Sequence, residues 1–215
     1  MRRTTEVLEE PEGQREGIQG IGPELAIMIL GDSAGAGVGS DHQNNALLGN
    51  VVKHLKEDFR VSYQLHATSG HTTLDCFAVI NDLPKSKVDV VLTSLGVNDV
   101  TSGASVSKFR ARQQELIETI EQRFSPRLII LTGVPPMKQF PALPQPLRWY
   151  LGSQAERFDT QLSSLGTRPK VRHLKLEFDP DPSLAATDGY HPGPKVYAKW
   201  GSSAATLIKS EIYEV

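Results

Sequence analysis

The chain has 215 residues, of which 39% are hydrophobic and 22% charged, close to the averages of soluble globular proteins. This composition excludes a wholly disordered, collagen-like or coiled-coil chain, and the length fits a single α/β domain. The formal net charge is −2, from 23 basic and 25 acidic residues that are interspersed, so nucleic acid is not expected as a partner. One cysteine, Cys76, excludes an internal disulfide framework and a cysteine-rich zinc site. Since no apolar run approaches the roughly 18 residues that span a bilayer, no membrane span is predicted.

Residues 1–24 are rich in charged residues, glycine and proline, and contain too few apolar residues to form a core. We predict a surface arm over 1–24 and a single domain over 25–215. The first apolar run, Leu25–Leu30, is shorter than the hydrophobic part of a secretory signal. The expected location is therefore the cytoplasm, unless a targeting or anchoring segment precedes the residues given.

From Leu25 onward, short apolar runs alternate with amphipathic stretches. The strands are predicted at Leu25–Leu30, Val61–His66, Val88–Leu95, Arg127–Thr132 and Val171–Leu176. The third and fourth runs are almost continuously apolar, which is typical of strands covered on both faces. Helical spacing of apolar residues is found within 47–59, 74–83, 106–124, 147–165 and 196–208. Five alternations of strand and helix predict a parallel sheet with helices on both faces.

The candidate chemistry follows the ends of these predicted strands. Ligands bind at the carboxyl ends of the strands in open parallel sheets, and Ser33 comes directly after the first strand. A serine hydroxyl becomes a good nucleophile only when a base removes its proton. We therefore predict His191 as the base, and Asp188 as the carboxylate that orients the imidazole and stabilises its protonated form.

Acyl transfer also needs fixed hydrogen-bond donors for the oxyanion. The candidate donors are the main-chain N–H groups of Ser33 and Gly70 and the side-chain amide of Asn98, which follow three of the predicted strands. Glycine at position 70 would let a substrate oxygen approach the main chain closely. Asp32 and Asp99 are interpreted as carboxylates that organise their loops by accepting main-chain N–H bonds.

These residues carry a family resemblance. The blocks Gly31-Asp32-Ser33, Gly70, Gly96-Val97-Asn98-Asp99 and Asp188-Gly189-Tyr190-His191-Pro192 occur in this order. In this pattern the chain resembles the SGNH (GDSL) hydrolase superfamily over residues 25 to about 210, and its first block is most similar to that of bacterial esterase-like members. Gly70 lies in a less distinctive setting than the other blocks.

The resemblance implies a three-layer α/β/α, flavodoxin-like fold whose five-stranded parallel sheet has the order 2-1-3-4-5. It also implies catalysis without a metal or an organic cofactor. Ser33 would be the nucleophile, Gly70 and Asn98 would donate to the oxyanion, and Asp188 and His191 would complete the triad.

The segment of residues 134–146 leaves the fourth predicted strand on the same side as Ser33. We predict that Met137, Phe140 and Leu143, with Trp149 nearby, form the wall of an acyl or alcohol pocket. A rigid connector without substrate contact is the alternative interpretation.

The predicted function is that of a serine esterase acting on small or medium acyl esters, a small-molecule substrate, through an acyl-enzyme. The alternatives within the same fold are a carbohydrate O-acetylesterase, a thioesterase and a lysophospholipase. A non-catalytic carbohydrate- or lipid-binding module is the alternative of a different class. The Gly31-x-Ser33-x-Gly35 pattern also matches the nucleophile elbow of α/β-hydrolases, but Ser33 follows the first strand and Asp188 lies only three residues from His191. No oligomeric state is predicted.

Overall fold

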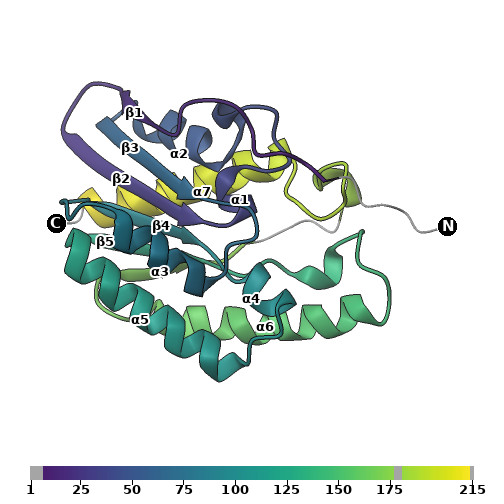
Figure 1. Ribbon diagram of the computed structural model, residues 1–215. Helices are drawn as coiled ribbons and strands as arrows, with labels where there is room; N and C mark the ends of the chain where they lie inside the picture. Colours follow the sequence, from purple (N-terminus) through teal and green to yellow (C-terminus); the bar gives the residue numbers. More distant parts are fainter. Residues whose placement is uncertain (1–6, 177–180, 214–215) are drawn as a thin grey trace.

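The computed structural model describes residues 7–176 and 181–213. It contains a six-stranded sheet with the order β1-β3-β2-β4-β5-β6, and helices lie on both faces of that sheet (Figure 1). The strands are β1 (Glu16–Gln19), β2 (Glu24–Gly31), β3 (Arg60–Ala67), β4 (Val90–Ser94), β5 (Leu128–Thr132) and β6 (Val171–Leu174). The five parallel strands β3-β2-β4-β5-β6 have the predicted order 2-1-3-4-5, so the predicted fold class is confirmed.

The helices follow the predicted amphipathic stretches, with short additional turns. They are α1 (Ser33–Ala36), α2 (Leu47–Leu55), α3 (Thr73–Asp82), α4 (Val97–Thr101), α5 (Val106–Phe124), α6 (Leu147–Leu165) and α7 (Pro194–Tyr213). Three 3-10 turns, η1 (Gln43–Asn45), η2 (Met137–Gln139) and η3 (Pro182–Leu184), interrupt the loops. Among the described residues, no helix combines the length and apolar character that a bilayer crossing needs.

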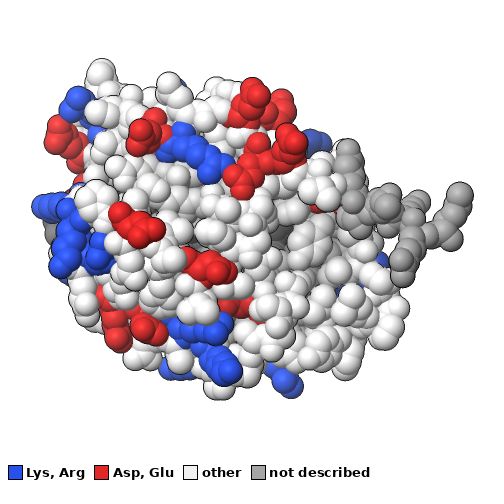
Figure 2. All heavy atoms as spheres, viewed as in Figure 1, with Lys and Arg blue, Asp and Glu red and all other residues white. Residues whose placement is uncertain are grey.

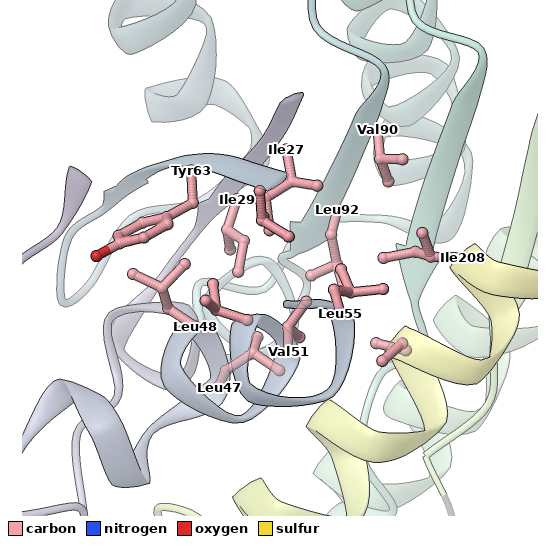
Figure 3. Packing of buried hydrophobic residues seen from close by; sticks show 14 of the residues in the cluster. Ile27, Ile29, Leu47, Leu48, Val51, Leu55, Tyr63, Val90, Leu92 and Ile208 are labelled. Carbon is pink, nitrogen blue, oxygen red and sulfur yellow. The ribbon is translucent and has the colours of Figure 1, made fainter. Parts of the chain in front are cut away.

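The pleat of the sheet divides the hydrophobic core into two layers. Alternate residues of the strands, such as Ile27 and Ile29 of β2, pack against α2 and α7 (Figure 3). Their neighbours Met28 and Leu30 face the other layer, which α3, α5 and α6 cover. Because both faces are covered, every residue of β4 and β5 is buried.

The strand count differs from the predicted five because β1 adds an antiparallel edge strand beside β3. Glu16 of β1 pairs with Gln64 of β3, and Gln19 pairs with Val61. Three of the four β1 residues are exposed and none is buried, so the segment lacks the apolar alternation that would identify a strand in the sequence. Part of the predicted surface arm therefore belongs to the sheet.

The central strands end in register, and this aligns the loops that carry the candidate site. Gly31, the last residue of β2, pairs with Ala67 of β3 on one side and with Ser94 of β4 on the other. A Cβ atom on Gly31 would lie 3.0 Å from the Ser94 carbonyl oxygen and 3.1 Å from the Cα atom of Gly35. Glycine at position 31 thus permits the close approach of the β4 end and the tight turn into α1.

Candidate active site

Ser33 is the first residue of α1, at the point where β2 ends. Asp32 precedes it as the N-cap, and its Oδ1 atom accepts hydrogen bonds from the N–H groups of Ala34 (3.0 Å) and Gly35 (3.4 Å). The helix ends after one turn at Gly37, whose φ of 97° is in the left-handed region. The short helix holds the half-buried Ser33 at the carboxyl edge of the sheet.

Asp188 and His191 lie in the turn before α7, and the turn orients the imidazole. Asp188 Oδ1 accepts the main-chain N–H groups of Tyr190 (2.9 Å) and His191 (3.0 Å), while Asp188 Oδ2 lies 2.5 Å from His191 Nδ1. An ionised carboxylate has no proton to donate, so Nδ1 donates and Nε2 of the neutral imidazole is an acceptor.

The imidazole of His191 contacts Ser33 although the two residues are 158 positions apart. Nε2 lies 2.9 Å from Ser33 Oγ, within hydrogen-bond distance. In the tautomer that Asp188 selects, the Ser33 hydroxyl donates to Nε2. The arrangement can therefore remove the hydroxyl proton as Oγ attacks an electrophile.

The two carboxyl groups beside Ser33 have opposite electrostatic environments. Burial raises the pKa of Asp188, but the hydrogen bonds from the His191 side chain and from the main chain of His191 and Tyr190 outweigh it, so the pKa is lower than usual. Asp32 is fully buried, and the loss of hydration raises its pKa to about 7 despite its main-chain donors. Burial likewise raises the pKa of Tyr190 to about 12.

A cavity opens beside the Ser33–His191 pair and encloses about 870 Å³, part of it continuous with solvent. Most of its wall is apolar, and its polar lining residues include Asp32, Ser33, Tyr190 and His191. The ring of Tyr190 connects the wall with the imidazole, since it contacts Phe140 and His191 edge to face at centroid distances of 5.1 and 5.3 Å. The apolar lining includes Leu95, Val97, Pro135, Pro136, Phe140, Pro141, Leu176, Leu184, Val196 and Trp200.

The four predicted pocket residues lie in different surroundings. Phe140 lines the cavity, but Met137 is fully buried in the core beneath η2. Leu143 is half-buried against the same core, and Trp149 is 62% exposed on α6. Met137 and Leu143, predicted for the wall, and Trp149, predicted nearby, are not among the residues that line this cavity. The wall comes instead from Phe140 and its neighbours in the segment 135–141, because η2 turns Met137 inward.

Gly70 occupies the turn that follows β3. The main-chain N–H of His71 donates to the Thr68 carbonyl at 3.2 Å, which closes a four-residue turn with Gly70 in third place. The φ of Gly70 is 86°, and a positive φ at this place is typical of a type II turn and favours glycine. No acceptor for the Gly70 N–H is found in the part of the chain that the structure describes.

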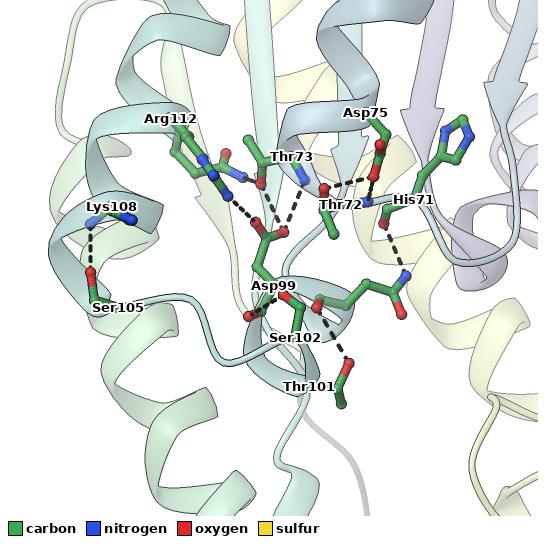
Figure 4. A network of polar contacts seen from close by, with 12 residues as sticks. His71, Thr72, Thr73, Asp75, Asp99, Thr101, Ser102, Ser105, Lys108 and Arg112 are labelled. Carbon is green, nitrogen blue, oxygen red and sulfur yellow. Dashed lines mark hydrogen bonds and ion pairs between the residues drawn. The ribbon is translucent and has the colours of Figure 1, made fainter.

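Asn98 belongs to α4 and touches the same turn. Its Nδ2 atom donates to the His71 carbonyl oxygen at 2.9 Å (Figure 4). This bond uses one of the two amide hydrogens, and the other remains available to a ligand. Neither Gly70 nor Asn98 contributes to the wall of the apolar cavity, so the two residues lie beyond its lining.

A buried polar network supports the turn from the α4 side. Asp99 is fully buried, and its Oδ2 accepts both the main-chain N–H and the hydroxyl of Thr73 at 2.9 Å (Figure 4). Gln113 of α5 donates to that hydroxyl at 2.8 Å, and Arg112 lies 3.9 Å from Asp99 Oδ1. Thr73 and Gln113, which belong to no motif in the sequence, link the start of α3 and the helix α5 to the residue after Asn98.

The chain matches a known family over most of its length. Residues 29–199 match the GDSL-like Lipase/Acylhydrolase family. The chain belongs to this family. Family membership supports an esterase or acylhydrolase, in agreement with the resemblance inferred from the sequence. No curated protein matches this GDSL-like chain.

Solved structures share the fold of this GDSL-like protein at low sequence identity. A carbohydrate esterase family 2 enzyme of Corynascus thermopiles (Myceliophthora fergusii) is 16% identical, with a TM-score of 0.65 over 90% of this chain and 68% of the other. A lipolytic G-D-S-L family protein of Veillonella parvula is 13% identical, with a TM-score of 0.68 over 86% and 98%. A lipase/acylhydrolase of Enterococcus faecalis is 18% identical, with a TM-score of 0.63 over 86% and 96%. At such identities, these likenesses show the fold alone.

The lowered pKa of Asp188 leads to a prediction about stability. Its pKa is lower in the folded protein than the ordinary value of 3.8, so the ionised form stabilises the fold at pH values above 3.8. This contribution is lost as the pH falls through the lowered value. We expect Asp188→Asn to reduce the free energy of unfolding near pH 6, and the difference from the unmodified protein to shrink towards pH 2. Urea denaturation at several pH values measures the free energy of unfolding of both proteins. A difference between them that stays constant with pH would contradict the expectation.

The effect of Asp32 on the free energy of unfolding should depend on pH in the opposite direction. Its pKa is about 7 in the folded protein and 3.8 when exposed, so the folded state binds the proton more tightly and loses stability as the pH rises from about 4 to 7. Asp32→Asn keeps an oxygen acceptor for Ala34 and Gly35 but does not ionise. The variant should therefore gain stability relative to the unmodified protein between pH 4 and pH 8, as measured by the same denaturation series. An equal pH dependence of the two proteins would show that Asp32 does not titrate in this range.

Proposed function

We propose that this protein is a serine esterase that hydrolyses small or medium acyl esters through an acyl-enzyme. The proposal depends mainly on two contacts of the His191 imidazole. Nδ1 lies 2.5 Å from Asp188 Oδ2, and Nε2 lies 2.9 Å from Ser33 Oγ. A binding module has no need of a hydroxyl joined to an imidazole and a carboxylate. Membership of the GDSL-like family supports the same reaction class.

In the proposed acylation step, His191 Nε2 takes the hydroxyl proton while Ser33 Oγ attacks the ester carbonyl carbon. The carbonyl oxygen becomes an oxyanion, and the Asp188 carboxylate stabilises the imidazolium. His191 then returns the proton to the alcohol oxygen, the bond between carbonyl carbon and alcohol oxygen breaks, and the alcohol leaves. In the second step a water gives a proton to His191 Nε2 as its oxygen attacks the acyl carbon. His191 then returns that proton to Ser33 Oγ, the bond between acyl carbon and Oγ breaks, and the acid leaves.

Three N–H donors are proposed for the oxyanion: the main chain of Ser33 and Gly70 and the amide of Asn98. The N–H of Gly70, for which the described residues provide no acceptor, and the second amide hydrogen of Asn98 support this role. The contact of Asn98 with the turn of Gly70 supports a common site, because it joins the loops that follow β3 and β4. Fixed donors of this kind stabilise charge that develops only during the reaction.

The substrate class follows from the cavity. Its wall is mainly apolar, and a few polar groups, among them Ser33 and His191, lie in its lining, as in many small-molecule sites. Phe140 and Pro141 would contact the acyl group or the alcohol. A panel of esters from acetyl to dodecanoyl, with acetylated sugars, acyl-thioesters and lysophospholipids, identifies the preferred substrate.

The first prediction of this proposal concerns the nucleophile. A fluorophosphonate probe should label Ser33 covalently, because attack of Oγ on phosphorus resembles attack on the ester carbonyl. Ser33→Ala should abolish the label and ester hydrolysis, and His191→Ala should slow both. Intact-mass spectrometry and peptide mapping locate the label, and circular dichroism verifies that each variant is folded. Labelling at another residue, or hydrolysis by folded Ser33→Ala, would refute the assignment.

The second prediction concerns the oxyanion donor on α4. We expect Asn98→Ala to lower kcat by about 10²- to 10³-fold, the usual cost of removing such a donor. Steady-state hydrolysis of p-nitrophenyl acetate measures the effect. Thr101→Ala is the matched control. Thr101 is exposed on the same helix, and among the described residues its Oγ1 hydrogen-bonds the Asn98 carbonyl oxygen alone, at 3.3 Å. Normal turnover by Asn98→Ala would remove the amide from the proposed site.

A further inference from the structure

Two charged residues of the N-terminal segment contact the turn that contains Gly70. Glu10 Oε1 accepts hydrogen bonds from the main-chain N–H of Ser69 at 2.7 Å and from its hydroxyl at 2.8 Å. Arg15 lies 2.5 Å from Glu10 Oε2 through Nη2, and its Nη1 donates to the Ala67 carbonyl oxygen at 2.9 Å. We call Glu10, Arg15 and Ser69 the clamp. It joins residues that are more than fifty positions apart in the chain.

We propose that the clamp positions the main-chain N–H of Gly70 for the oxyanion, so that Glu10 and Arg15 are positioning residues of the reaction. This inference rests on the proposed function, in which Gly70 is an oxyanion donor.

The turn needs support because little else contacts its middle. Thr68, Ser69 and Gly70 are all exposed, and a Cβ atom placed on Gly70 would meet no atom within 4 Å. The ends of the turn are tied by the Thr68 N–H, which donates to the Gly31 carbonyl at 3.2 Å, and by the bond from Asn98 to the His71 carbonyl. Between these ends, Glu10 is the group that holds Ser69, the residue directly before Gly70.

A glycine in an exposed turn has more conformational freedom than any other residue. Fixing the peptide unit that precedes it restricts the direction of its N–H. Oxyanion donors act only when they are held in place before the charge develops. The Gly70 N–H therefore needs an external contact that fixes its direction, and the clamp provides this contact at Ser69.

The bonds of the clamp have the character of strong hydrogen bonds. Burial raises the pKa of Glu10, but the hydrogen bonds from Ser69 and Arg15 outweigh it and lower the pKa below its ordinary value. The carboxylate is therefore ionised at neutral pH, and hydrogen bonds to an ionised acceptor are shorter and stronger than neutral ones.

The N-terminal segment is itself fixed to the domain, which makes it a firm support. The Leu65 N–H donates to the Arg15 carbonyl at 2.8 Å, next to the pairing of β1 with β3, and the Gln43 N–H donates to the Glu12 carbonyl at 2.8 Å. Pro11 is buried beside Glu10. The stretch from Pro11 to Arg15, which follows Glu10, is therefore attached to the domain at several points. Its residues precede position 29, where the match to the GDSL-like family begins.

Glu10→Ala tests the proposal, with Glu9→Ala as the matched control. Glu9 is exposed on the same segment, so its removal changes the charge equally without touching the turn. In Glu10→Ala we expect kcat for p-nitrophenyl acetate to fall roughly tenfold with little change in KM, a fraction of the loss caused by deleting an oxyanion donor. Hydrogen exchange of the main-chain amides at 68–71 should become faster, while Glu9→Ala behaves as the unmodified protein.

Two further variants distinguish a loss of positioning of the Gly70 N–H from a general loss of structure. Glu10→Gln keeps an oxygen for Ser69 but loses the ion pair with Arg15, so it should recover part of the kcat that Glu10→Ala loses. Ser69→Ala removes the hydroxyl bond and leaves the N–H bond, so its effect should be smaller than that of Glu10→Ala. Thermal unfolding of each variant verifies that the domain is intact.

The outcomes distinguish this inference from the proposed function. If Glu10→Ala has normal kcat and normal amide exchange while the unmodified protein hydrolyses esters, the clamp has no positioning role. If amide exchange is faster but kcat is unchanged, Gly70 needs no positioning and the inference is again overturned. If the unmodified protein neither hydrolyses esters nor reacts with a fluorophosphonate at Ser33, the proposed function fails and the catalytic meaning of the clamp fails with it.

Discussion

The hydrogen bond between Ser33 Oγ and His191 Nε2 is the contact on which the proposed chemistry depends, and the whole domain is needed to form it. It joins the end of β2 to the turn before α7, 158 residues later. The helix α7 packs against α2 on one face of the sheet, so its N-terminal turn reaches the carboxyl edge where Ser33 lies. The hydrophobic layer between α7 and the strands thereby determines a distance between two polar atoms.

The two aspartates next to this bond show how similar groups acquire different properties. Asp188 receives three close hydrogen bonds between 2.5 and 3.0 Å, and these keep it ionised despite partial burial. Asp32 is fully buried, and two of its three partners, Gly35 and Ser94, lie at 3.4 Å. Loss of hydration therefore dominates at Asp32 and raises its pKa to about 7. The carboxylate beside the imidazole is the one suited to stabilise an imidazolium, whereas Asp32 caps the helix of the nucleophile.

The residue pattern was sufficient to predict the parallel sheet and the juxtaposition of Ser33 with His191, whereas the strand order came from the resemblance to a known family. Continuous apolar runs identify β4 and β5, and the carboxyl-edge rule then places the residues that follow the strands in one region. The sequence was insufficient to predict which side chains of the segment after β5 line the cavity. There Met137 and Phe140 lie in an irregular loop whose side chains follow no period, so nothing in the order of residues indicates that Met137 enters the core while Phe140 lines the cavity.

The edge strand β1 in the N-terminal segment was also not predicted, for a different physical reason. Exposed side chains and glycines in β1 give no apolar alternation, and Glu10 and Arg15 resemble ordinary solvated charges. Their partners, Ser69 and Ala67, follow about fifty residues later, beyond the reach of any local pattern.

The turn that contains Gly70 lies between two polar supports of different origin. On one side Asn98 and the buried Asp99 connect it to α4, α3 and α5 inside the region that matches the family. On the other side Glu10 and Arg15 connect it to a segment that precedes this region. A main-chain donor offers no side chain through which packing could fix it, so its direction depends on hydrogen bonds to its neighbours. In this chain those hydrogen bonds come from the Asn98 amide on one side of the exposed glycine turn and from Glu10 and Arg15 on the other.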